Sequence, residues 1–274
     1  MTITQSGTSR KPGRTTSHRR IDLEALLLPL QPLAKKLYRS NLTGFEIQNH
    51  FYSLPRFLFV GPGNKGTEYI RLGIFAGIHG DEDAGVLATI EFARQLALHP
   101  EWGQGYEIFF YPICNPSGLE DRTRHSRRGK DLNREFWSGS REPEVQTLEE
   151  ELNSLNFHGI ISLHSDDTSE GIYGFVGGAE MTRHVLLPAL LAAETVLPRN
   201  IAKTIDGFEA AHGIIDKGYS GVLSAPVNRR SDTFEIVFET PHLADRNLQI
   251  EANLLALKAV LKEYRGFISM SQNL

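Results

Sequence analysis

Short apolar stretches that alternate with helix-like stretches constrain the fold of this chain more than any other feature. Tyr69–Ala76, Tyr106–Ile113 and Gly159–His164 are almost uninterrupted apolar runs, as in strands buried on both faces. Glu82–Leu98 carries its apolar residues at spacings of three and four, which is typical of a helix with one buried face. We therefore predict an α/β fold: a single domain with a mixed, mostly parallel sheet and helices on both faces.

The remaining elements follow from the same patterns. Further strands are predicted at Phe45–Tyr52, Arg56–Val60, Gly171–Val176 and Thr233–Glu239, and further helices at Pro143–Leu155, at Glu180–Leu197 with a disturbance at Pro188, and at Leu248–Tyr264. Gly61–Gly66 matches the dinucleotide-binding pattern G-x-G-x-x-G, which requires a strand before it and a helix after it. Because a strand follows instead, we interpret these glycines as a hairpin turn.

Charge is unevenly distributed along the 274 residues. Residues 1–20 contain five basic side chains and no acid, so the net charge of −4 leaves −9 on the rest of the chain. We predict a flexible basic tail at 1–20 and one catalytic domain at 21–274. Leu23–Leu33 is interpreted as a short helix that packs on this domain, with an organellar transit peptide as the alternative. The acidic body argues against nucleic-acid binding, and no apolar run is long enough to cross a membrane.

Candidate metal ligands follow two of the predicted strands. His79 and Glu82 come directly after one strand, and His164 ends another. Strand ends are where open α/β sheets place ligand-binding groups, and a catalytic zinc ion needs three protein ligands with one position open. Asp167 and His164 form a second possible ligand pair. We rank it lower because two complete pairs would give the zinc ion four protein ligands and leave no open position. The lone Cys114 excludes a thiolate cluster. Taken singly, His79 and Glu82 could instead be a polar pair that caps the next helix, and His164 could be a histidine of the core.

A loop between these strands is dense in basic side chains. Six of the thirteen residues from 122 to 134 are Arg or Lys. Because the body of the chain is acidic, this density favours a small anionic substrate, and a planar guanidinium holds a carboxylate through two hydrogen bonds. An exposed, solvated loop is the alternative.

Taken in order, these motifs resemble the zinc carboxypeptidase superfamily, over about residues 45–264. The matching pieces are His79-x-x-Glu82, the loop with Arg124, Asp131-Leu-Asn133-Arg134-x-Phe136 and Ser-Leu-His164-Ser165. The superfamily includes carboxypeptidase A-like peptidases, murein-peptide amidases, and the succinylglutamate desuccinylase and aspartoacylase enzymes.

The resemblance implies a role for each matching residue. His79, Glu82 and His164 would bind one zinc ion per chain, and Asn133 and Arg134 would hold the free carboxylate of the substrate. Arg124 would stabilise the oxyanion, with Arg127 as its competitor. The general base would be a late Glu, either Glu235 or Glu239, and Glu239 is chosen because it ends its strand. Tyr219 would cap the bound substrate.

The function implied is zinc-dependent amide hydrolysis. The leading expectation is a metallocarboxypeptidase-like enzyme that cleaves a short peptide with a free carboxylate. An N-acyl-amino-acid deacylase of the desuccinylase and aspartoacylase type is the alternative, and we rank it second because only 35 residues follow Glu239, too few for the β-rich domain usual in those enzymes. A non-catalytic binding module is the remaining possibility. No secretion signal is evident, so we expect a cytoplasmic protein that needs neither membrane nor nucleic acid.

Overall fold

The computed structural model describes residues 20–63, 68–215, 223–226 and 233–271. Ten strands form one sheet in the order β1-β4-β6-β5-β7-β12-β8-β11-β10-β9, and β2 and β3 form a separate hairpin. The strands are β1 (Leu37–Asn41), β2 (Phe45–Ile47), β3 (His50–Tyr52), β4 (Pro55–Val60), β5 (Ile70–Ala76), β6 (Tyr106–Tyr111), β7 (Gly159–Asp166), β8 (Tyr173–Val176), β9 (Thr204–Ile205), β10 (Phe208–Ala211), β11 (Ile214–Ile215) and β12 (Phe234–Pro241).

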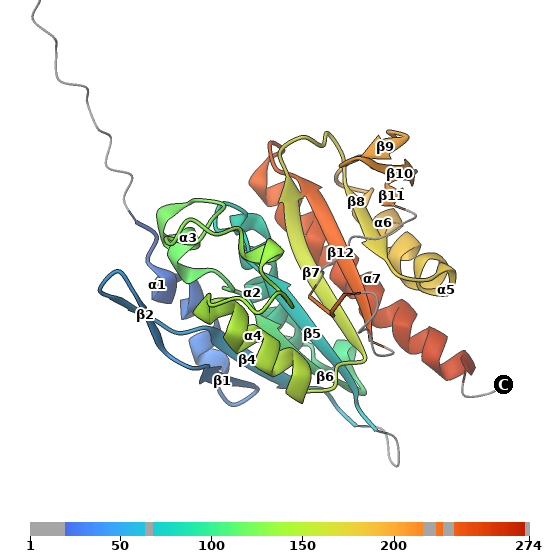
Figure 1. The fold of residues 1–274 in the computed structure, drawn as a ribbon. Helices are drawn as coiled ribbons and strands as arrows, with labels where there is room; N and C mark the ends of the chain where they lie inside the picture. The colour runs from blue at the N-terminus through green and yellow to red at the C-terminus, as the bar shows by residue number, and fades with distance from the viewer. Residues whose placement is uncertain (1–19, 64–67, 216–222, 227–232, 272–274) are drawn as a thin grey trace, which may run out of the picture.

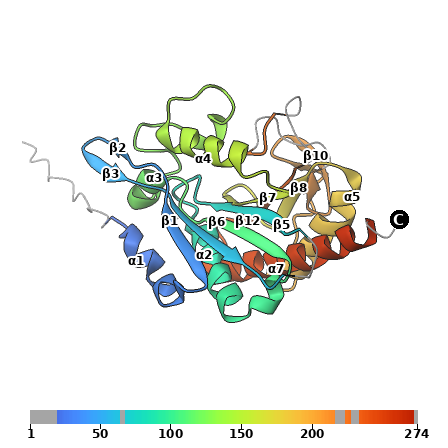
Figure 2. The same cartoon turned by 90° about the horizontal axis from the view of Figure 1, so that it is seen from below.

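The α-helices lie in two layers around this sheet (Figures 1 and 2). They are α1 (Leu23–Leu27), α2 (Asp83–Leu98), α3 (Pro116–Asp121), α4 (Pro143–Ser154), α5 (Ala179–Met181), α6 (Leu187–Ala193) and α7 (Arg246–Ser271). Helices α2, α6 and α7 share one apolar core with one face of the sheet, and α4 shares a second core with the other face. The predicted α/β domain is thereby confirmed.

The centre of the sheet is its parallel part. Strands β6, β5, β7 and β12 run parallel, while β4 on one side and β8 on the other are antiparallel to them. The carboxyl ends of β5, β7 and β12 therefore meet at one edge, where ligand sites form in sheets of this kind. Because β5 and β7 are covered by helices on both faces, most of their residues are apolar, which is why they were predictable.

Three local predictions need correction. Phe45–Tyr52 is two short strands joined at Gln48 and Asn49, whose positive φ angles of 47° and 64° form a tight turn. Gly61–Gly66 does not join a hairpin, because β6 lies between β4 and β5 in the sheet; residues 64–67 lie outside the described residues. Strand β1 was missed because four of its five side chains are at least partly exposed at the sheet edge, so its sequence is polar.

The helix predicted at Glu180–Leu197 is disturbed, as expected, but before the proline. A π-helical turn at Thr182–Leu186 joins α5 to α6. Pro188 is in the first turn of α6, where its missing N–H costs little. Leu23–Leu33 forms α1 and a 3₁₀ turn, as predicted. None of the helices in the described ranges combines the length and apolarity that a membrane span needs.

One carboxyl group in α4 is buried without a side-chain partner. Glu144 is 0% exposed, and neither of its carboxylate oxygens has a hydrogen-bond partner. Burial, reinforced by the nearby charge of Glu142, raises the pKa of Glu144 to about 7. The folded protein therefore holds a proton on Glu144 at pH values where the unfolded chain has lost it.

This buried carboxyl predicts a pH-dependent stability. Between about pH 4.5 and pH 7 the folded state binds more protons than the unfolded state, so the free energy of unfolding falls as pH rises. Glu144→Gln removes this loss, and at pH 8 we expect the variant to be more stable than the wild type by on the order of 1–3 kcal/mol. Urea unfolding at pH 5 and pH 8 measures it, with the exposed Glu150→Gln on the same helix as control. A wild type as stable at pH 8 as at pH 5 would contradict this expectation.

Candidate metal centre and active-site cleft

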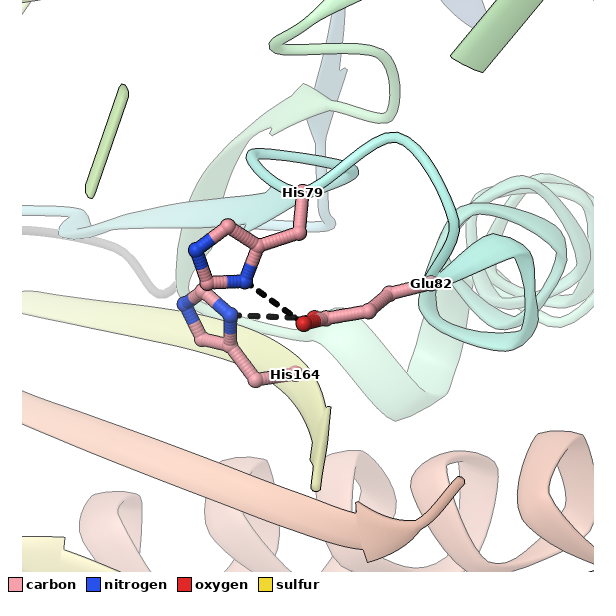
Figure 3. Close-up of side chains that lie close together, drawn as sticks. All are labelled: His79, Glu82 and His164. Atoms are coloured by element: carbon pink, nitrogen blue, oxygen red, sulfur yellow. Dashed lines mark hydrogen bonds and ion pairs between the residues drawn. The ribbon is translucent and has the colours of Figure 1, made fainter. Parts of the chain in front are cut away.

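The three predicted metal ligands meet at the edge of the sheet. His79 and Glu82 lie in the loop between β5 and α2, and His164 lies near the end of β7. One ligand atom from each of the three side chains lies within 4.8 Å of the others, and all three residues are buried. His79 Nδ1 is 2.5 Å from Glu82 Oε1, and His164 Nδ1 is 3.1 Å from Glu82 Oε2 (Figure 3).

This donor set fits a zinc ion. Two imidazole nitrogens and a carboxylate are the ligands that catalytic zinc takes, at about 2.0–2.2 Å each, with a further position left open. Both Nδ1 atoms face the same carboxylate, so one ion could contact all three groups. Burial alone would raise the pKa of Glu82, but the neighbouring His164 and His79 hold it well below its usual range. The carboxylate is therefore ionised, as a ligand must be.

Asp131 supports this centre from outside, a role that the sequence reasoning missed. Its Oδ1 lies 3.1 Å from His79 Nε2, so it can hold the imidazole with Nδ1 toward the other ligands. Burial alone would lower the pKa of His79, but hydrogen bonds to Asp131 and Glu82 raise it to about 9. The only sequence signal was the position of Asp131, two residues before Asn133.

Close backbone packing fixes the loop that carries His79. Gly77 has a φ of +64°, which turns the chain as it leaves β5. A Cβ on Gly80 would lie 2.0 Å from the backbone of Gly118, so only glycine allows these two segments to approach. The buried Asn115 amide donates to the carbonyl of Ile78 at 3.1 Å. These contacts hold the metal-ligand loop against the start of α3, the helix that precedes the arginine-rich loop.

The two candidate arginines have different surroundings. One face of Arg124 is open to solvent, and its guanidinium lies 3.2 Å from Asp131 Oδ2 and 3.7 Å from Glu82 Oε1. Arg127 is largely buried and forms ion pairs with Glu120 at 2.6 Å and Asp121 at 2.7 Å. The charge of Arg127 is neutralised by these two acids, so of the two candidates Arg124 is the one that lies beside the metal ligands and is partly exposed.

The two candidate bases are also separated. Glu239 is paired in register with His164 across β12 and β7, and it lines the same cleft as His79, Glu82 and Arg124. Glu235 is 5% exposed and accepts hydrogen bonds from the backbone N–H groups of Leu223 and Ser224. The carboxylate of Glu235 therefore anchors a loop. Burial of the Glu239 carboxyl raises its pKa to about 8.

The other predicted substrate-binding residues lie at the margin of the site. Asn133 and Arg134 lie in a 3₁₀ turn at Leu132–Arg134, and the backbone N–H of Asn133 donates to Asp131 Oδ1 at 3.1 Å. Arg134 is exposed, and its charge contributes to the lowered pKa of Asp131. Asp167 lines the cleft but is outside the group of three ligands. Tyr219 lies outside the described residues.

Comparison with known proteins supports the same class. Residues 68–200 match the model of the succinylglutamate desuccinylase/aspartoacylase catalytic domain. A predicted metallopeptidase of Shewanella baltica superposes with a TM-score of 0.73 at 20% identity, covering 88% of this chain and 92% of that one. A metallo-carboxypeptidase of Burkholderia cenocepacia superposes with a TM-score of 0.71 at 14% identity, covering 90% of this chain and 70% of that one. No curated protein matches the chain.

A vertebrate structure extends this likeness beyond bacteria. Bovine thrombin-activatable fibrinolysis inhibitor, in complex with a tick carboxypeptidase inhibitor, superposes with a TM-score of 0.60 at 16% identity, covering 87% of this chain and 94% of that one. The chain therefore shares its fold with these metallopeptidase and carboxypeptidase structures. Together with the family match over 68–200, this confirms the resemblance to the zinc carboxypeptidase superfamily.

Proposed function

We propose that this protein is a zinc-dependent amide hydrolase that cleaves a short peptide bearing a free carboxylate. The observation that carries the proposal is that His79, Glu82, Arg124 and Glu239 line one cleft of about 320 Å³, with His164 buried beside His79 and Glu82. The five residues come from four segments of the chain, because His79 and Glu82 share one loop, and each has the chemistry that amide hydrolysis requires.

Each side chain has a distinct task in this proposal. His79, Glu82 and His164 would hold the zinc ion, which when bound supplies a Lewis acid and favours deprotonation of water. The Glu239 carboxylate takes a proton from the attacking water and delivers it to the leaving amine. Arg124 stabilises the negative charge that develops on the carbonyl oxygen. Asp131 keeps His79 in its ligating orientation.

A second function is favoured by one specific observation. The family model that matches residues 68–200 describes the catalytic domain of succinylglutamate desuccinylase and aspartoacylase. A deacylase that releases an amino acid from an N-acyl amino acid would use the same centre for the same bond. The two functions differ in the acyl group of the substrate. In the peptidase the acyl group is derived from an amino acid or a peptide, and in the deacylase it is derived from a simple carboxylic acid.

A hydrolysis screen tests both functions. Short peptides and N-acyl amino acids would be incubated with the protein, with and without a zinc chelator, and the released amines quantified. We expect chelator-sensitive hydrolysis of the peptides. Chelator-sensitive release only from N-acyl amino acids would replace the first function by the second. A stable wild-type protein that binds no zinc and hydrolyses neither class would overturn both.

Arg134 gives a prediction about substrate orientation. Arg134→Ala is expected to reduce kcat/KM by about 10–100-fold for a peptide with a free C-terminal carboxylate, because a charged hydrogen bond is lost. The amidated peptide has no such carboxylate and should be affected much less. Steady-state kinetics on the two peptides measure the difference, with Arg128→Ala, exposed in the same loop, as control. Equal losses on both peptides would remove Arg134 from carboxylate binding.

A further inference from the structure

The cleft around the candidate metal centre has an arginine on one side and a group of carboxylates on the other. On one side lies Arg124, followed along the chain by the turn that holds Asn133 and Arg134. The other side is formed where β7 and β12 end and where the β9–β10 hairpin reaches the cleft. Its polar lining residues are Asp166, Asp167, Thr168, Tyr173, Asp206 and His242.

The first acidic group of this wall is held by its neighbours. Thr168 donates to Asp166 Oδ1 from its backbone N–H and from its hydroxyl, each at 2.7 Å. The Tyr173 hydroxyl donates to Asp166 Oδ2 at 3.0 Å. Asp166 is therefore fixed in place by neutral donors, and its negative charge is left uncompensated by any described cation.

The other two carboxylates of this wall lack such hydrogen bonds within the described residues. Asp167 and Asp206 are exposed, and neither has a hydrogen bond or an ion pair to any residue in the described parts of the chain. His242, whose Nδ1 lies 2.9 Å from Ser165 Oγ, adds an imidazole to this wall, and the Tyr173 phenol and the Glu239 carboxyl also line the cleft. Three carboxylates thus face the cleft opposite Arg124, with one imidazole among them.

The position of Asp206 is set by a tight turn. Asp206 and Gly207 connect β9 to β10 with φ angles of +47° and +79°, as in the two-residue turns that match the twist of a hairpin. Ile205, next to the turn, is 4% exposed and packs in a small core with Tyr173 and Phe175. Because the residue next to the turn is anchored in this core, the hairpin presents Asp206 at a defined place on the cleft wall.

We propose that the cleft selects substrates whose acyl side carries a positively charged group, and that Asp206 is a specificity-determining residue for it. This inference rests on the proposed function, in which the carboxylate of the leaving residue lies toward Arg134. The acyl side of an extended substrate then lies against the opposite wall. An ammonium group there is attracted by Asp206, Asp167 and Asp166, whereas a second carboxylate is repelled. The wall thus favours a peptide with a free amino group over a dicarboxylic acyl group.

The test compares three acyl groups on one leaving residue. Lysyl-alanine, acetyl-alanine and succinyl-alanine differ in acyl charge and share the amide that is cleaved. Asp206→Asn is expected to lower kcat/KM for lysyl-alanine by about 3–10-fold and to change that for acetyl-alanine by less than about twofold. Asp206→Lys should lower kcat/KM for lysyl-alanine by at least about tenfold and raise that for succinyl-alanine. Glu209→Gln, exposed on the same hairpin, is the control.

Equilibrium binding of lysyl-alanine and succinyl-alanine to the metal-free protein provides a second readout. A wild type that prefers succinyl-alanine in both assays would overturn this inference, as would an Asp206→Asn variant that changes all three substrates equally. If the wild type hydrolyses none of the three but binds lysyl-alanine more tightly than Asp206→Asn does, the proposed function fails while the charge selection stands.

Discussion

Replacing Glu239 by glutamine is expected to reduce kcat by about 10²–10⁴-fold while zinc binding is retained. The amide has almost the shape of the carboxylate but cannot accept a proton from water. Glu239 does not belong to the group of three ligands, so the metal content should stay at one zinc ion per chain. Rates on the best substrate of the hydrolysis screen, together with metal analysis of the same sample, give both quantities.

Glu235 provides the matched control for this experiment. Glu235 lies on the same strand as Glu239, but its carboxylate accepts hydrogen bonds from the backbone N–H groups of Leu223 and Ser224. Glu235→Gln therefore changes a carboxylate that is not among the residues lining the cleft. We expect this variant to lose stability and to keep kcat within a few-fold of the wild type. If Glu239→Gln stays fully active while Glu235→Gln does not, the assignment of the base is reversed. If both stay active, another group carries the proton.

Removing either histidine of the metal centre is expected to abolish both zinc binding and hydrolysis. His79→Ala and His164→Ala each delete one of three ligands, and the two that remain cannot hold the ion tightly. The effect is visible without activity, because a ligand that binds only the folded state raises the midpoint of unfolding. Zinc should therefore raise the Tm of the wild type and leave that of each variant unchanged.

An exposed histidine serves as the control for the metal measurement. His99 stacks on Trp102 after the end of α2, away from the cleft, so His99→Ala should bind zinc as the wild type does. Retention of one zinc ion by His164→Ala would show that the metal lies elsewhere, and the proposed function would lose its centre. Loss of zinc from all three variants would point to a general effect on folding.

The predictability of this site follows from the strands that carry it. Strands β5 and β7 are buried on both faces, so their largely apolar sequences indicated that His79 follows one strand and that His164 lies near the end of the other. The choice of Glu239 over Glu235 used the same logic, because only the former lies near the carboxyl end of β12. In the structure Glu239 lines the cleft and Glu235 accepts a hydrogen bond from a loop, and the assignment of the base stays a prediction.

Elements with polar or irregular sequences were less predictable. Strand β1 lies at a sheet edge and has no apolar alternation, so nothing in its sequence indicates a strand. The Gly61–Gly66 segment has the composition of a turn, but whether two consecutive strands are neighbours depends on β6, which comes later in the chain and lies between them. Local patterns describe the backbone over a few residues and do not determine this order.

The sequence by itself determined the class of fold and indicated the three candidate ligands and the candidate base, because these depend on burial patterns and on strand ends. Only the tertiary structure decided which arginine is available, since Arg127 is neutralised by Glu120 and Asp121. The contact of Asp131 with His79 and the acidic wall with Asp206 also joined segments far apart in the chain. Contacts between side chains from separate loops depend on how those loops pack, which no local pattern encodes.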